Sequence, residues 1–179
     1  MNDWTLYPTW IATALSIVGW LYFVHREYAP DRPTTLSDLS TRSRKTRLYF
    51  RTLMLVCPLL FAITGLWFVH YRLESAIITA LWLTTILCCM MAGIFLPTHG
   101  REKLLHTFFA VIMGLAMLAL VVAGAIVAPR YHAVLWLIFV VMAALAIIGP
   151  RQKRHYIVYE LDFMFLSHVS MVVIALAVA

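Results

Sequence analysis

Long apolar runs, separated by short breaks rich in proline, glycine or charge, set the pattern of this chain. A bilayer core about 30 Å thick needs roughly 20 apolar residues of helix. Six runs reach about that length, and hydrocarbon offers their backbone no hydrogen-bond partners, so each run is predicted to be a helix. The predicted spans are residues 7–24, 50–70, 75–96, 104–128, 131–149 and 156–179.

The breaks between the runs predict how the helices connect. Breakers and charges gather at residues 97–103, 129–130 and 149–154, where helices are expected to end. Connections this short place neighbouring helices antiparallel. Asp3 precedes the first run and no Lys or Arg does, so we expect a retained anchor and not a cleaved signal peptide. The expected fold is all-α: residues 1–179 form a single domain, a polytopic integral membrane protein built as a bundle of six transmembrane helices.

Composition agrees with a membrane location. Hydrophobic residues make up 63% of the chain and charged residues only 12%, where soluble domains carry about a quarter. The net charge of +6 comes from residues between the apolar runs and not from a recognition helix, so we predict membrane lipid and not nucleic acid as the partner. Cys57, Cys88 and Cys89 lie inside apolar runs and are expected to be packing residues.

The distribution of basic residues predicts an orientation, because cytoplasmic loops are enriched in Lys and Arg. Twelve of the fourteen Lys and Arg residues lie in the first, third and fifth connections or at their borders, and only Arg72 and Arg130 lie on the other side. This asymmetry predicts a multi-pass protein of the bacterial cytoplasmic (inner) membrane with both termini outside the cytoplasm. The twelve are Arg26, Arg32, Arg42, Arg44, Lys45, Arg47, Arg51, Arg101, Lys103, Arg151, Lys153 and Arg154.

The connection between the first two runs is the only long one. Thr35 followed by Asp38 resembles a helix N-cap, so a short cytoplasmic helix is predicted here. Near the surface, each basic residue contributes about 1 kcal/mol to binding of anionic lipid. The candidate anionic-lipid contacts are therefore Arg42, Arg44, Lys45 and Arg47, and the alternative is that these residues only set the orientation.

Small residues at helical spacing predict helix contact faces, because close approach drives association in lipid. In the fourth run His106, Ala110 and Gly114 form such a line. The third run has a longer ridge at every fourth position, which consists of Ala76, Ala80, Thr84, Cys88 and Ala92.

Polar residues in the last run are the strongest candidates for a ligand or proton site, because an acidic residue inside a span costs about 2.5–3.5 kcal/mol at its centre. Glu160 and His168 lie on roughly one helix face, about 12 Å apart along the axis. The alternative is that the span begins near Phe163, with Glu160 and Asp162 at the headgroups. The candidate site residues are Glu160, Asp162, Ser167, His168 and, in the fourth run, His106.

Histidines near the ends of the runs keep a haem or metal hypothesis open, because imidazole is a common axial and metal ligand. No metal-binding or haem-attachment motif supports it, so no cofactor is predicted and the metal assignment stays unknown. The histidines in question are His25, His70, His99, His106, His132 and His155.

Three short stretches resemble a bacterial six-helix membrane family, the domain of unknown function nine-nine-eight. They are Thr35-Leu36-Ser37-Asp38-Leu39 before the second run, Gly93-Ile94-Phe95-Leu96-Pro97 closing the third, and Leu105-His106 opening the fourth. The resemblance implies the six-helix architecture and draws attention to Asp38 and His106.

The leading functional hypothesis is a non-enzymatic bundle that serves as a subunit or binds lipid or another small ligand, with a second membrane protein or another copy of itself as a partner. One alternative is a proton-coupled small-molecule carrier that uses Glu160 and His168. The other is a haem- or metal-binding membrane redox protein.

Overall fold

Helix is the only regular secondary structure in the described part of the chain, as predicted. The computed structural model describes residues 7–27, 35–64, 75–98, 100–151 and 156–177. In order, the elements are α1 (Tyr7–Glu27), α2 (Leu36–Ser40), α3 (Arg44–Thr64), α5 (Ala76–Ile94), α6 (Gly100–Val127), the 3-10 turn η3 (Pro129–Tyr131), α7 (His132–Ile148), the 3-10 turn η4 (Gly149–Arg151) and α8 (Tyr156–Ala177).

Five of these helices are long and apolar enough to cross a membrane. They are α3, α5, α6, α7 with its flanking 3-10 turns, and α8. The first predicted span, residues 7–24, corresponds to α1, which has 21 residues and is not among the five. The protein is therefore a candidate multi-pass membrane protein.

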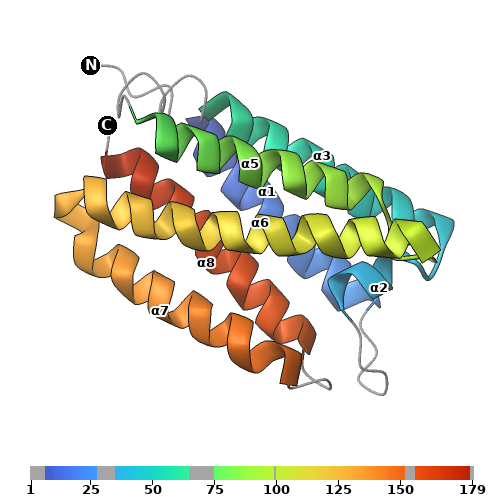
Figure 1. Cartoon of the computed structure of the whole chain (residues 1–179). Helices are drawn as coiled ribbons and strands as arrows, with labels where there is room; N and C mark the ends of the chain where they lie inside the picture. Colours follow the sequence, from blue (N-terminus) through green and yellow to red (C-terminus); the bar gives the residue numbers. More distant parts are fainter. Residues whose placement is uncertain (1–6, 28–34, 65–74, 99, 152–155, 178–179) are drawn as a thin grey trace.

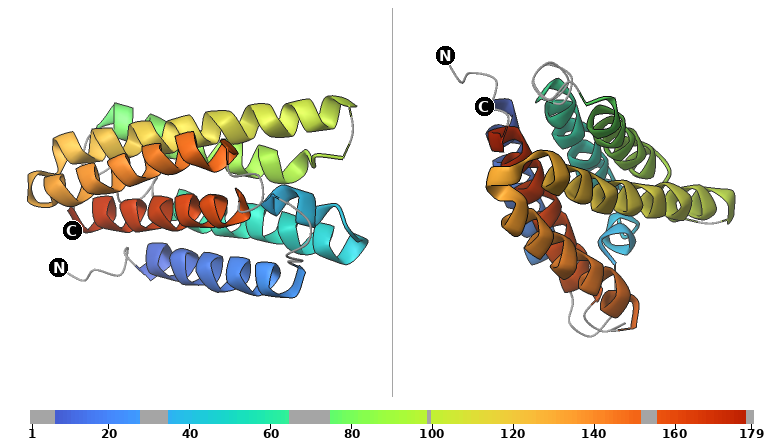
Figure 2. Two further views of the ribbon diagram at one scale, coloured as in Figure 1. Left: turned by 90° about the horizontal axis from the view of Figure 1, so that it is seen from below. Right: turned by 60° about the vertical axis from the view of Figure 1, so that its left-hand side comes forward.

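The long helices form an up-and-down bundle. Figure 1 shows them side by side, with the start of α1 and the end of α8 at one end of the bundle and α2 at the other. Each long helix packs on the next in sequence, and α8 returns to pack on α1, which closes the helices into a ring. Helices α1 and α8, which form this closure, lie alongside each other in Figure 2.

Basic residues gather at the end that holds α2, which we call the basic end. Figure 1 places the last turns of α1, α5 and α7 and the first turns of α3, α6 and α8 there. Arg130, in η3, lies at the opposite end. The predicted basic residues Arg32, Lys153 and Arg154 lie outside the described residues, as does Arg72. The described residues at the basic end are Arg26, Arg42, Arg44, Lys45, Arg47, Arg51, Arg101, Lys103 and Arg151.

The start of the second span differs from the prediction. Helix α3 begins at Arg44, six residues before Phe50, because a polar cap extends it. The Ser43 hydroxyl accepts from the Thr46 N–H at 3.1 Å, and the Thr46 hydroxyl accepts from the Ser43 N–H at 2.9 Å. Hydropathy does not register such a charged first turn. The predicted end of this span, residues 65–70, lies outside the described residues.

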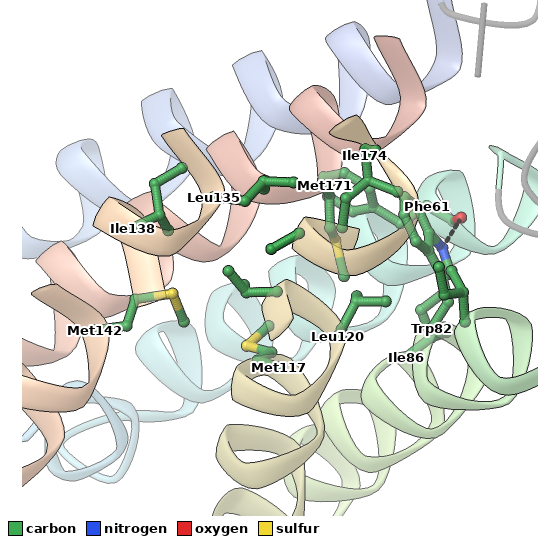
Figure 3. Packing of buried hydrophobic residues seen from close by; sticks show 14 of the residues in the cluster. Phe61, Trp82, Ile86, Met117, Leu120, Leu135, Ile138, Met142, Met171 and Ile174 are labelled. Atoms are coloured by element: carbon green, nitrogen blue, oxygen red, sulfur yellow. Dashed lines mark hydrogen bonds between the residues drawn. The ribbon is translucent and has the colours of Figure 1, made fainter. Parts of the chain in front are cut away.

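The main core joins the helices away from the basic end. Trp82 of α5 is 0% exposed, and its indole Nε1–H donates to the carbonyl of Phe61 in α3 at 2.8 Å. Figure 3 shows this bond beside Ile86, with Leu120 and Met171 from two further helices nearby. A buried indole needs such a partner, so this bond fixes α5 against α3.

A second, aromatic core lies nearer the basic end. Trp20 of α1 meets Phe50 of α3 edge-on, with ring centroids 5.4 Å apart. Helix α2 adds Leu36 and Leu39 to this cluster, and α8 adds Ile157. The short helix is therefore packed onto the bundle and not free in the connection.

The predicted small-residue faces are only partly correct. In the third-run ridge, Cys88 and Ala92 are buried, but Ala76 and Ala80 are exposed. A step of four residues turns about 40° around a helix, so a line of five leaves the contact face. In the fourth-run line His106 is buried, whereas Gly114 has open space where a Cβ would be. Two helices approach closely instead at Gly93, where a Cβ would lie 2.5 Å from Cβ of Met54.

Candidate functional site

His106 closes the end of the preceding helix. The last carbonyls of a helix have no partner within it, and a buried carbonyl needs one. The His106 Nδ1 lies 2.9 Å from the carbonyl oxygen of Ala92 and 2.8 Å from that of Phe95. Both partners can only accept, so Nδ1 carries the proton and donates to the C-terminal carbonyls of α5.

His132 has the same role one helix later. The carbonyl of Ala125 would bond to the N–H four residues on, but that residue is Pro129, which has none. The His132 Nδ1 lies 2.9 Å from this carbonyl oxygen and donates to it. The proline that ends α6 therefore creates the acceptor that the first residue of α7 satisfies.

Two arginines of the basic end also donate to helix C-termini. Arg51 Nη2 donates to the carbonyl of Ile94, the last residue of α5, at 3.2 Å. Arg42 donates to the carbonyl of Glu27, the last residue of α1. Arg42, predicted as an anionic-lipid contact, thus binds the backbone of its own chain, although its side chain is exposed.

Glu160 connects the last helix to α2. The predicted capping box is present: the Thr35 hydroxyl accepts from the Asp38 N–H at 3.0 Å, and the Asp38 carboxylate accepts from the Thr35 N–H at 3.1 Å. The N–H of Leu36, the first residue of α2, is bonded by Glu160, whose Oε2 accepts it at 2.7 Å. A carboxylate at a helix N-terminus is favourable for the exposed amides and for the helix dipole.

Two further predicted residues of α8, Ser167 and His168, bond within their own helix. Ser167 donates to the Phe163 carbonyl at 2.7 Å, and the His168 Nδ1 donates to the Met164 carbonyl at 2.6 Å. The His168 ring also meets Phe61 edge-on at 5.1 Å. Glu160 and His168 are thus both hydrogen-bonded to backbone groups, and the carrier hypothesis built on them stays a prediction.

A groove runs between α1 and α8, where the ring of helices closes. It encloses about 250 Å³ and is half open to the outside of the bundle. Its walls are mainly apolar, and its polar residues are Ser16, Asp162 and His168. We call it the α1–α8 groove, and it is lined by Ser16, Ile17, Trp20 and Leu21 of α1 and by Leu161, Asp162, Met164, Phe165 and His168 of α8.

A smaller hollow of about 190 Å³ lies on the other side of the same helix. It is formed by Val141 and Leu145 of α7 together with Asp162, Phe165 and Leu166 of α8. Asp162 and Phe165 therefore border both hollows. Of the predicted site residues on α8, Asp162 and His168 share the α1–α8 groove, whereas Glu160 and Ser167 do not line it.

The remaining basic candidates differ in exposure. Arg44 and Lys45 are exposed in the first turn of α3. Arg47 is half-buried, and its Nε is a buried donor without a hydrogen-bond partner among the described residues. Arg44 and Lys45 are thus exposed with no hydrogen bond to the described residues, whereas Arg42 is exposed but bonded to the carbonyl of Glu27.

The histidines do not form a cluster in the described part of the chain. His106 and His132 are held at opposite ends of α6. Among the described residues, no group of three or more His, Cys, Asp or Glu side chains is placed to hold a metal ion. His70, His99 and His155 lie outside the described residues, and the haem or metal hypothesis stays a prediction.

Sequence reasoning missed the α1 wall of the groove. Apolar residues such as Ile17, Trp20 and Leu21 are common on any helix surface that faces lipid or packs on another helix. Nothing in the sequence therefore distinguishes these three residues from other apolar residues of the helix. Their significance comes from the closure of the ring, which brings together residues about 140 positions apart in the chain.

No protein-family profile, curated protein or solved structure matches this chain. The resemblance to the family of unknown function nine-nine-eight therefore stays a prediction.

Proposed function

We propose that α1 is a sixth membrane span and that the basic end faces the cytoplasm of a bacterial cell. With 21 residues, α1 has the length of a span, and it packs in the ring on two helices that are candidate spans. Both ends of the chain then lie outside the cytoplasm. The gathering of basic residues at one end supports this orientation.

Within that bundle, we propose a non-enzymatic function: binding of a membrane lipid in the α1–α8 groove. The observation that carries this proposal is a half-open groove with mainly apolar walls between two membrane helices. A groove of this kind in a membrane is surrounded by lipid acyl chains, which are therefore its most available apolar ligand. Arg44 and Lys45 provide a separate contact for anionic headgroups at the basic end.

The size of the groove favours part of a lipid over a whole small molecule. Pockets that enclose drug-sized ligands hold about 300–1,000 Å³ and cover most of the ligand. The α1–α8 groove encloses about 250 Å³ and stays half open. It therefore accommodates a segment of an acyl chain while the rest of the lipid stays in the bilayer.

The test uses lipid retention with a matched pair of substitutions on α1. Leu21 lines the groove and is 57% exposed, whereas Leu15 is 49% exposed and does not line it. Leu21→Trp is expected to fill the groove and reduce the lipid retained on the purified protein in native mass spectrometry. Leu15→Trp adds the same bulk to the same helix and is expected to retain lipid as the unsubstituted protein does.

A photoreactive fatty acid incorporated into the membrane gives an independent measurement. Cross-linked peptides from α1 and α8 in the unsubstituted protein, lost in Leu21→Trp, would support the proposal. An unsubstituted protein that carries no lipid, or a Leu21→Trp protein with unchanged lipid and unchanged cross-links, would contradict it.

A further inference from the structure

Asp162 is the acidic residue of α8 for which the described residues provide no partner. Glu160 bonds to the backbone of α2, and Asp38 bonds to the backbone of Thr35. Asp162 is exposed and has no hydrogen bond or ion pair with the other residues that the structure describes. A carboxylate inside a span is stabilised by a cation or a hydrogen-bond donor, and none of the described residues provides one to Asp162.

Its position suits a ligand at the level where acyl chains meet headgroups. Asp162 lies six residues after Tyr156, about 9 Å along α8 from the basic end. Side chains tilt toward the N-terminus of their helix, which for α8 is the basic end. The carboxylate is therefore directed toward the headgroups, while Phe165 and His168 line the groove one and two turns deeper.

We propose that the α1–α8 groove selects lipids whose headgroup carries a primary ammonium group, with Asp162 as the acceptor. This proposal rests on the proposed lipid binding and names the class of lipid. The ammonium group of an ethanolamine lipid is the complementary charge, and an acyl chain of the same molecule lies against Ile17, Leu21 and Phe165.

Hydrogen-bond chemistry sets the order of preference. A primary ammonium group has three N–H donors and forms a charge-assisted bond to a carboxylate. A choline headgroup has the same charge but no N–H, so it keeps only the Coulomb attraction. A glycerol headgroup has hydroxyl donors but no cation, and its lipid is anionic, so the carboxylate repels it. The expected order is ethanolamine, then choline, then glycerol.

The experiment measures which lipids stay bound. The protein is reconstituted in bilayers of equal parts ethanolamine, choline and glycerol phospholipids with identical acyl chains, and the lipids retained after mild detergent extraction are quantified. We expect about two- to fivefold enrichment of the ethanolamine lipid over the choline lipid, as for a partly exposed charge-assisted hydrogen bond. Both lipids are zwitterionic, so Arg44 and Lys45 do not affect this comparison. Asp162→Asn is expected to bring this ratio to that of the bilayer while the total retained lipid stays the same.

Two variants serve as controls. Asp162→Glu keeps the carboxylate and is expected to keep the enrichment. Glu102→Gln removes an exposed carboxylate at the same end of the bundle, outside the groove, and is expected to change nothing. Elution of every variant as one symmetric peak shows that it is folded.

The outcomes distinguish the headgroup preference from the lipid binding on which it rests. Retained lipid in the bilayer ratio, or enrichment that persists in Asp162→Asn, overturns the headgroup preference and leaves lipid binding intact. A second protein chain that is retained in place of lipid and lost in Asp162→Asn also overturns it. Absence of any retained lipid overturns both proposals.

Discussion

Polar side chains in this bundle mainly satisfy the ends of helices. His106, His132, Arg42 and Arg51 donate to C-terminal carbonyls, and Glu160 accepts from the N-terminus of α2. Each is a residue type that might otherwise indicate a ligand, proton or headgroup site. In a membrane protein, where water cannot satisfy buried backbone groups, this role is expected near helix ends.

The sequence predicted the caps whose partners are local. Thr35 and Asp38 are three residues apart, so their capping box could be predicted from spacing alone. The bonds of His106 and Glu160 reach carbonyls and amides on other helices, 14 and 124 residues away. Spacing carries no information about such pairs, because they depend on how the helices pack.

Substitution of His106 tests its role at the end of α5. His106→Ala removes the donor to two carbonyls in a buried site and is expected to destabilise the protein by about 1–3 kcal/mol. A drop of several degrees in the melting temperature in detergent would measure this loss. Thr107→Ala, at the exposed neighbouring position, is expected to leave the melting temperature unchanged. Equal melting temperatures of the two variants would contradict the capping role.

Substitution of Glu160 tests the attachment of α2. Glu160→Ala leaves the Leu36 N–H without its acceptor, so hydrogen exchange of the α2 amides is expected to accelerate. Glu160→Gln keeps an acceptor oxygen and loses only the charge, so its acceleration is expected to be smaller. Amides in the first turns of α7, at the opposite end of the bundle from this bond, provide the internal reference. Unchanged exchange in Glu160→Ala would show that the apolar contacts of Leu36 and Leu39 hold α2 on their own.

At the scale of elements, hydropathy located the helices but not their contact faces. The predicted and observed limits of α8 share the start at Tyr156, whereas α3 begins six residues early on a polar cap. The predicted and observed contact faces differ more than the helix limits do. A line of residues at every fourth position turns gradually around the helix, and small residues also occur at positions where no other helix packs. Gly93 and Gly114 illustrate the difference, since only the first faces a neighbouring backbone.

These two glycines give a matched pair of substitutions. A Cβ at Gly93 would lie 2.5 Å from Cβ of Met54, an atom that cannot swing aside, so α3 and α5 would have to separate. Gly93→Ala is expected to lower stability by about 1–3 kcal/mol, as other overpacked cores do. Gly114→Ala meets no atom within 4 Å and is expected to be neutral or to stabilise its helix by up to about 1 kcal/mol. Melting temperatures that fall by the same amount would contradict the close approach at Gly93.

At the scale of the whole molecule, short connections predicted antiparallel neighbours but not the closure of the ring. Packing of α8 on α1 joins the first and last helices, and no local pattern specifies it. The α1–α8 groove exists only because of this closure. The candidate site could therefore be predicted in part, through Asp162 and His168, while its other wall could not.

Cysteine labelling at three exposed positions tests the proposed topology. Tyr7 lies at the start of α1, Arg130 lies in η3 at the same end of the bundle, and Lys45 lies at the basic end. If six helices cross and the basic end faces the cytoplasm, Tyr7→Cys and Arg130→Cys are labelled by a membrane-impermeant maleimide on intact cells. Lys45→Cys is then labelled only after the membrane is opened, because charged connections of this kind stay on the side where the chain is made.

The pattern of labelling separates the number of spans from the orientation. The native cysteines lie inside α3 and α5, and the unsubstituted protein gives their background labelling. Labelling of Arg130→Cys without labelling of Tyr7→Cys would mean that α1 does not cross the membrane. In that case Tyr7 would stay on the cytoplasmic side with the basic end. Labelling of Lys45→Cys alone on intact cells would reverse the orientation and remove the basis for placing anionic headgroups of the inner leaflet beside Arg44 and Lys45.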